Sequence, residues 1–175
     1  MIRINAIMTI CVLVHFTLIH GCDIMTPPVK TIEPPASRVY FNSFESQGDT
    51  IGWKGLMEFR ADAPPLGGKH SVLISGGCIY PHAYYDLPVS QEDNYLIVKC
   101  FGKNLSNGGG IELDLSDNDA HHHIVIGITD TIWRSYQSRD TLYCPRNTRL
   151  RLSMSSGGIV PSSMLVDLLE VLKVN

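Results

Sequence analysis

The sequence predicts an all-β domain, an antiparallel β-sandwich, on the strength of three observations. Short runs rich in β-branched and aromatic residues recur along the chain, turn-forming residues separate them, and no convincing helix is found. Several runs alternate apolar and polar side chains, which is typical of strands with one buried and one solvated face. About nine or ten such strands, at spacings of about 8 to 15 residues, favour two packed sheets.

The predicted strands follow one another between clusters of Gly, Pro, Asn and Asp, such as residues 64–68 and 107–110. In residues 148–154, leucines and a methionine alternate with arginines and a serine, so one face of this strand is expected to face water. We expect strands at residues 39–44, 53–60, 70–75, 80–87, 95–101, 111–115, 124–129, 132–137 and 148–154.

The last apolar segment, residues 164–174, fits two interpretations. Its leucines have helical spacing, whereas its three valines and the all-β context favour a strand. A strand would place on one face Met164, Val166, Leu168, Leu172 and Val174, with Glu170 as the exception.

The first residues have the pattern of an export signal. Arg3 is their only charged residue, and an apolar run at 6–19 is followed by Gly21 and a cysteine. A positive start, an apolar stretch of about 14 residues and a small residue at the cleavage site are typical of secretory signals. The run is also shorter than the roughly 20 residues that a membrane-spanning helix needs. Residues 1–21 are therefore predicted to be a signal peptide.

Residues 22–37 are expected to form an extended tether, because two Pro-Pro pairs favour a semi-rigid polyproline conformation. Residues 38–175 then have the length of a single domain. The formal net charge of the chain is −3. This mild acidity argues against nucleic acid as a partner, since phosphate binding needs clustered Lys and Arg.

Three cysteines fall in the predicted domain: Cys78, Cys100 and Cys144. Their spacing matches no zinc-binding pattern, so we interpret them as small buried apolar side chains. In an oxidising compartment one pair could form a disulfide and leave a single thiol, and the sequence leaves this open.

The end of the signal, Leu-Ile-His-Gly-Cys at residues 18–22, resembles the lipobox of bacterial lipoproteins. This resemblance implies that Cys22 becomes the first residue, carries acyl chains such as palmitate, and anchors the protein to a membrane of the cell envelope. Several acyl chains would hold it firmly, because each buried methylene contributes about 0.8 kcal/mol. The alternative is an ordinary signal followed by an incidental cysteine.

Four motifs in succession resemble the carbohydrate-binding modules that have a galactose-binding-like jelly-roll fold. They are Phe44-Glu45-Ser46 with Gly52-Trp53, residues 68–74, residues 131–136 and residues 165–171. Together they span nearly the whole predicted domain. The resemblance implies a jelly-roll sandwich that binds glycan or polysaccharide without catalysis.

The same resemblance implies one structural calcium between the first and last strands, with Glu45 and Asp167 as candidate ligands. The family commonly has paired aspartates in its last strand, whereas here Leu168 follows Asp167. An unpaired charge in an apolar strand is costly, so Asp167 has reason to lie near a cation or a donor. The alternative is a carboxylate at the sheet edge that faces water.

The densest group of aromatic and hydrogen-bonding side chains supplies the candidate ligand-binding residues Tyr80, His82, Tyr84 and Tyr85. Alternation along a strand places the first three on one face and Tyr85 on the other. Tyrosine offers stacking area and a hydroxyl group at low entropic cost. The alternative is that these are ordinary sheet tyrosines.

No hydrolase motif and no phosphate-binding loop is found, and we predict that the protein is not an enzyme. At most two of the three histidines at 121–123 could converge on a metal, and a solvated loop entering a strand is the favoured interpretation. Glu112 and Asp114 share one face of a strand, which an exposed sheet explains without chemistry.

The sequence thus favours a lipid-anchored cell-envelope protein that binds glycan or polysaccharide. A structural or protein-interaction subunit of the envelope is the first alternative, and a metal-dependent hydrolase built around the histidines is the second. We interpret Trp53 and Trp133 as side chains that close the sandwich edges rather than as sugar platforms.

Overall fold

The computed structural model describes residues 37–76, 83–116, 122–157 and 161–174. Within these ranges the chain is almost entirely β-structure. The elements are β1 Arg38–Asn42, η1 Gln47–Thr50, β2 Trp53–Gly55, β3 Glu58–Arg60, β4 Ser71–Gly76, β5 Ala83–Asp86, β6 Asn94–Ser106, β7 Gly109–Leu115, β8 His123–Ile128, β9 Arg134–Gln137, β10 Leu142–Cys144, β11 Leu150–Ser155 and β12 Ser162–Val174. The one helix in these ranges, η1, has a single turn and is far too short to cross a bilayer.

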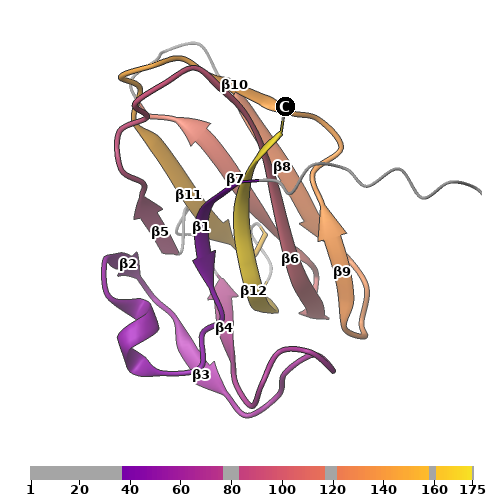
Figure 1. Ribbon diagram of the computed structural model, residues 1–175. Coiled ribbons are helices and arrows are strands. Elements are labelled where there is room, and N and C mark those ends of the chain that lie inside the picture. Colours follow the sequence, from indigo (N-terminus) through magenta and orange to yellow (C-terminus); the bar gives the residue numbers. More distant parts are fainter. Residues whose placement is uncertain (1–36, 77–82, 117–121, 158–160, 175) are drawn as a thin grey trace, which may run out of the picture. The chain divides into compact units, whose positions relative to one another are not determined.

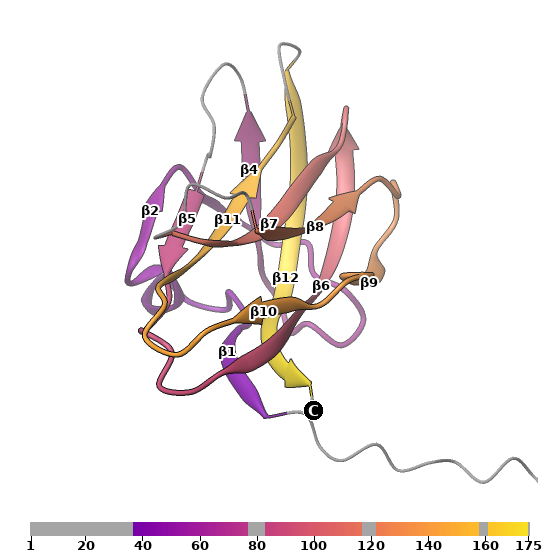
Figure 2. The ribbon, with the colours of Figure 1, turned by 90° about the horizontal axis from the view of Figure 1, so that it is seen from above.

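The strands form two antiparallel sheets, which pack face to face (Figures 1 and 2). One sheet has seven strands in the order β10-β6-β12-β4-β3, with β1 added on β12 and β9 on β6. The other has five strands in the order β2-β5-β11-β7-β8. The predicted class, an antiparallel β-sandwich, is confirmed.

The core lies between the sheets and follows the alternation of the strands. In β11, Leu150, Leu152 and Met154 are buried in the core, whereas Arg151 is half-buried on the opposite face. This is the wet face that the sequence predicts for the strand. Alternation in β8 is equally regular, with Ile124 inside and its neighbours exposed.

The last segment, β12, is a strand and not a helix, but the predicted grouping of its side chains is wrong. The register with β6 shifts between Asp167 and Glu170, where Leu168 has a φ of 46°. This bulge reverses the alternation, so Leu169 and Val171 continue the core side in place of Leu168 and Leu172. Asp167, which comes before the shift and alternates with the core residue Val166, lies on the outer side of the seven-stranded sheet.

The single strand expected at residues 53–60 is divided between the two sheets. Its first part is β2, which pairs with β5, and its second part is β3, which pairs with β4. Gly55, with a φ of 106°, provides the backbone conformation with which the chain leaves the first sheet. β10 was not expected from the sequence, because three residues are too few to show a pattern.

Cys100 and Cys144 are buried free thiols that belong to the core cluster, as the sequence predicts. Burial raises the pKa of Cys100 to about 12, so this thiol is inert at neutral pH. Cys78 lies outside the described residues, as does Cys22.

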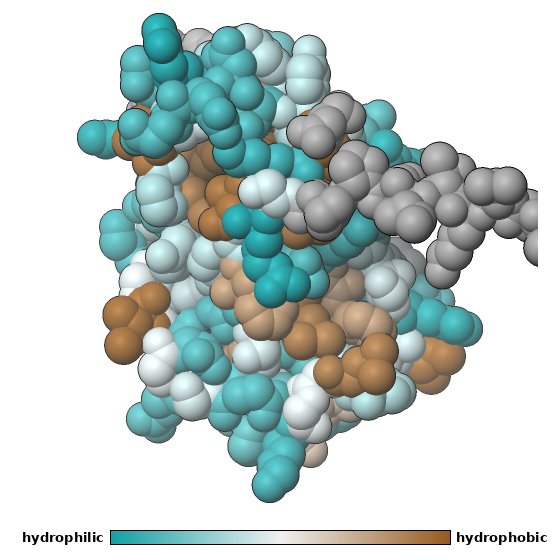
Figure 3. All heavy atoms as spheres, in the orientation of Figure 1, coloured by the Kyte–Doolittle hydropathy of each residue, from teal (hydrophilic) through white to brown (hydrophobic). Residues whose placement is uncertain are grey.

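Among the described residues, exposed apolar side chains are dispersed rather than gathered into one surface. The most exposed are Ile51, Leu56 and Leu66, which stand in different loops. On the face drawn in Figure 3, brown patches lie apart from one another between polar side chains. Dispersed apolar residues of this kind are ordinary in soluble domains and mark no binding surface by themselves.

Candidate functional site

The outer face of the five-stranded sheet carries two rows of polar and aromatic side chains. Strand alternation turns Tyr84 and Asp86 of β5 outward, while Ala83 points into the core. The first row follows the pairing register through Lys54, Tyr84, Ser153, Glu112 and Val125. The second row follows it through Asp86, Arg151, Asp114 and His123. We call these two rows the polar face.

The Tyr84 ring contacts the two basic side chains of this face, Arg151 and Lys54. The guanidinium carbon of Arg151 stands 4.4 Å from the centroid of its ring, and Nζ of Lys54 stands 5.3 Å away. Cations held near an aromatic ring in this way fix its orientation. The ring therefore has a defined position on the sheet, and the two cations cover part of its surface.

Asp86 holds both of these cations in place. Nε of Arg151 donates to Oδ1 at 2.8 Å, and Nζ of Lys54 donates to Oδ2 at 3.3 Å. The hydrogen bond from Arg151, and then that from Lys54, lowers the pKa of the Asp86 carboxyl against the opposing effect of burial. Because both cations are paired with a carboxylate, the polar face does not present an excess of positive charge.

The acidic part of the polar face lies on β7. Glu112 and Asp114 share a face, as the sequence predicts, and His123 places Nδ1 at 3.7 Å from Oε1 of Glu112. Burial raises the pKa of Asp114, and the negative charge of Glu112 raises it further. These groups supply hydrogen-bond acceptors on the same face as Tyr84, two strands away from it.

The structure separates the candidate ligand-binding residues of the sequence. Tyr84 belongs to the polar face, whereas Tyr85 points inward and packs against Tyr40 and Trp53, with ring centroids 4.9 and 5.7 Å apart. Alternation had predicted these opposite directions. Tyr80 and His82 lie outside the described residues.

Both tryptophans donate a hydrogen bond from the indole nitrogen to another side chain of the domain. Nε1 of Trp53 donates to the Tyr40 hydroxyl at 2.8 Å, and its ring packs against the core. Nε1 of Trp133 donates to the Asp62 carboxylate at 2.8 Å. The same carboxylate accepts a hydrogen bond from Nζ of Lys103 at 2.7 Å. This geometry favours the interpretation that both rings close the sandwich.

The two candidate calcium ligands come together at the turn Gly67-Gly68. A Cβ atom on Gly67 would stand 2.0 Å from Oδ2 of Asp167, and one on Gly68 would stand 2.3 Å from Oε1 of Glu45. Adjacent glycines thus make room for two carboxylates that are distant in sequence. The tight corner at Phe44, with a φ of 49°, directs Glu45 to this turn.

Glu45 accepts hydrogen bonds at both carboxylate oxygens, whereas Asp167 accepts one at Oδ1 only. The N–H groups of Lys69 and His70 donate to Glu45 at 3.0 to 3.2 Å, and the first of these bonds has the largest effect in lowering its pKa. Asp167 is wholly buried, and only Oδ1 accepts a bond, from the Leu168 N–H at 2.7 Å. No donor among the described residues reaches Oδ2.

Burial raises the pKa of Asp167 to about 7, and the charge of Glu45 adds to this effect. A buried carboxylate oxygen without a donor is expensive unless a proton or a cation satisfies it. The residues at this turn therefore fit the calcium that the resemblance implies: two carboxylates, one of them missing a partner.

The histidine run does not assemble a metal centre in the part of the chain that the structure describes. No group of three or more His, Cys, Asp or Glu side chains there is arranged to hold an ion. His122 and His123 are exposed, and His121 lies outside the described residues.

Sequence reasoning singled out Tyr84 but missed the side chains that organise the polar face. Lys54 and Arg151 come from strands far from Tyr84 in the chain, and the pairing of β2 and β11 with β5 brings them together. No local pattern reveals such a contact. Only the alternating polar positions of the strands indicated that these residues point outward.

No family model matches the chain, and no curated protein matches it in sequence. Solved structures are similar in fold. The CBM22-1 xylan-binding domain of Xyn10C from Paenibacillus barcinonensis aligns with a TM-score of 0.59 and 16% identity, over 80% of this chain and 96% of that domain.

The C-terminal family 22 carbohydrate-binding module of Xyn10B from Clostridium thermocellum aligns with a TM-score of 0.55 and 13% identity, over 80% of this chain and 96% of that one. At these identities the likeness concerns the fold. The chain therefore has a jelly-roll β-sandwich similar to that of these carbohydrate-binding modules.

Proposed function

We propose that this domain binds polysaccharide through the polar face and performs no catalysis. The observation that carries the proposal is the Tyr84 ring, oriented by Arg151 and Lys54 within rows of hydrogen-bonding side chains. A sugar has an apolar face of C–H groups that packs on an aromatic ring, and hydroxyl groups that both donate and accept. The polar face offers complementary groups of each kind.

The extent and charge of the polar face favour a polymer without acidic groups. The rows cross all five strands of the sheet, which suits several consecutive sugar units better than one small molecule. Lys54 and Arg151 share this face with three acidic side chains, Asp86, Glu112 and Asp114, so the face as a whole does not favour uronic acids. The xylan-binding domain of similar fold from Paenibacillus barcinonensis supports xylan as the first probe.

Affinity electrophoresis of the full chain in gels that contain xylan, glucomannan or mixed-linkage glucan tests the proposal. Retardation by at least one polymer is expected, and it should be markedly weaker in Tyr84→Ala. Tyr95→Ala is the matched control, because Tyr95 is 54% exposed but stacks with Tyr143 on the other sheet. No retardation by any polymer, with envelope proteins co-purifying instead, would favour the protein-interaction alternative.

We further propose that the protein is exported and anchored to the cell envelope by acyl chains on Cys22, through the tether of residues 22–37. The lipobox-like residues 18–22 support this. Mass spectrometry of the mature amino terminus is the test. A diacylglyceryl-modified peptide beginning at Cys22 is expected, and an unmodified peptide that begins elsewhere would exclude the anchor.

We also propose that Glu45 and Asp167 hold one structural calcium ion. The unpaired Oδ2 of Asp167 and the joint approach of both carboxylates to Gly67-Gly68 support it. A bound calcium would neutralise the two carboxylates and fix the turn against β12. It would have no part in sugar chemistry, because this turn and the polar face belong to different sheets.

A further inference from the structure

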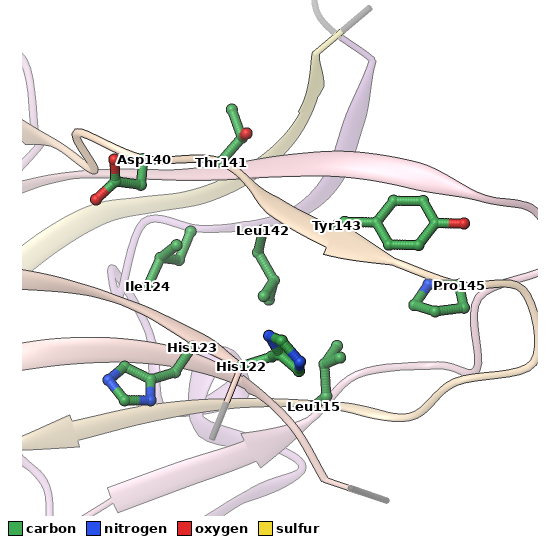
Figure 4. A pocket seen from close by; sticks show the side chains of 9 residues that line it. All are labelled: Leu115, His122, His123, Ile124, Asp140, Thr141, Leu142, Tyr143 and Pro145. Carbon is green, nitrogen blue, oxygen red and sulfur yellow. The ribbon is translucent and has the colours of Figure 1, made fainter. Parts of the chain in front are cut away.

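A cavity of about 410 Å³ opens between the two edge strands β8 and β10, one from each sheet. Its floor is formed by Leu115, Ile124 and Leu142, all of them aliphatic and nearly buried. In the close view of Figure 4, the imidazole of His122 lies between Leu115 and Leu142. A volume of this size is within the range of small-ligand pockets.

The rim of the cavity combines donors and acceptors around the apolar floor. His122 supplies an imidazole and Asp140 a carboxylate, whereas the side chain of Thr141 points away from the cavity (Figure 4). The ring of Tyr143 is directed away along β10 and stacks with Tyr95 at 5.3 Å (Figure 4). The floor therefore lacks the aromatic surface on which a whole sugar ring would stack, and suits a small aliphatic group.

The cavity adjoins the polar face. His123 is the last member of one of its rows and also lines the cavity, with Nδ1 at 3.7 Å from Glu112. A polymer that lies along the rows would therefore bring a substituent of one sugar unit to the cavity mouth.

We propose that the cavity binds the acyl substituent of an acetylated polysaccharide, an inference that rests on polysaccharide binding at the polar face. The methyl group would enter between the aliphatic side chains, and the carbonyl oxygen would accept a hydrogen bond from the His122 imidazole. Burial of one methyl group corresponds to about a fourfold gain in affinity. The protein would thus distinguish acetylated from bare chains of the same sugar.

The test compares O-acetylated xylan and glucomannan with the same preparations after mild alkaline deacetylation, by titration calorimetry with the full chain. The wild-type protein is expected to bind an acetylated form about fourfold or more tightly than its deacetylated counterpart. In His122→Trp, whose larger ring obstructs the space between Leu115 and Leu142, the ratio of the two affinities should fall to about one. His122→Ala, which removes the donor, should reduce the ratio as well.

Tyr84→Ala is the matched control: it should weaken binding of both forms and keep their ratio. Equal affinity of the wild-type protein for both forms would overturn the acyl pocket and leave the polar face intact. A preference that survives in His122→Trp would also overturn it. Failure to bind either form of any polymer would overturn the proposed function, and the pocket with it.

Discussion

The carboxyl group of Asp167 lies directly against Gly67, so closely that a Cβ atom on this glycine would stand 2.0 Å from Oδ2. Alternation in β12 turns Asp167 away from the core that Val166 faces, and the turn at Gly67 then covers it. The burial of Asp167, its raised pKa and its lack of a donor at Oδ2 all follow from this contact.

Replacement of Gly67 should therefore destabilise the domain. In Gly67→Ala the new methyl group would meet Asp167 at 2.0 Å and Pro64 at 2.5 Å, and the expected loss is about 2 to 4 kcal/mol in the free energy of unfolding. Gly127→Ala in β8 is the control, because its Cβ would meet nothing within 4 Å. Urea unfolding measures both, and equal midpoints for the two variants would contradict the packing.

Asp167 should make stability depend on pH in the metal-free protein. Its folded-state pKa is about 7 against an ordinary value of 3.8, so between these limits the folded state binds a proton that the unfolded chain does not. The free energy of unfolding should thus fall as pH rises from about 4 to 7, by at most about 1.4 kcal/mol per pH unit, and level off above.

Asp167→Asn should remove this contribution, and the difference between the wild-type and variant curves isolates it from the other carboxyl groups. The measurement is thermal or urea unfolding with a chelator at each pH. Parallel curves for the two proteins would show that Asp167 ionises normally in the fold.

Calcium should raise the melting temperature of the wild-type protein, and a chelator should reverse the effect. An ion that binds the folded state alone stabilises it in proportion to the logarithm of its concentration above the dissociation constant. Asp167→Asn should abolish the calcium response and Glu45→Gln should weaken it. Differential scanning calorimetry with calcium, magnesium or chelator measures this, and an unchanged wild-type melting temperature would exclude the site.

The adjacent residues Tyr84 and Tyr85 should respond in different assays. Tyr85→Ala removes a ring packed on Tyr40 and Trp53 and should cost about 3 kcal/mol of stability. Tyr84→Ala should change stability by about 1 kcal/mol or less and act on polysaccharide affinity instead. If Tyr84→Ala proves the more destabilising of the two, the ring has a structural role.

The sequence was sufficient for the fold class because strand alternation is local. Arg151 and the leucines on either side of it are expected on opposite faces of the strand, and the structure places them there. The bulge in β12 could not be predicted from the sequence, since nothing in residues 164–174 indicates a left-handed backbone conformation at Leu168. Its cause lies in the pairing with β6 and in the turn that packs over Asp167.

The candidate sites show the same difference between local sequence patterns, which can be predicted, and contacts set by strand pairing, which cannot. Tyr84 could be picked out because it lies in a dense local cluster, whereas its partners Lys54 and Arg151 depend on strand register. Glu45 and Asp167 were indicated by the family resemblance, and only the fold brings them to one turn. The cavity beside His122 arises where two sheet edges meet, which no stretch of sequence records.

The position of β12 also determines the order in which the domain can assemble. It is the last strand along the chain, yet it pairs with β1, β4 and β6 inside the seven-stranded sheet (Figure 1). Without it, that sheet falls into separate pieces: β1 alone, β4 with β3, and β6 with β9 and β10. Contacts between such distant segments form slowly. A nascent chain can therefore complete this sheet only after β12 has been synthesised.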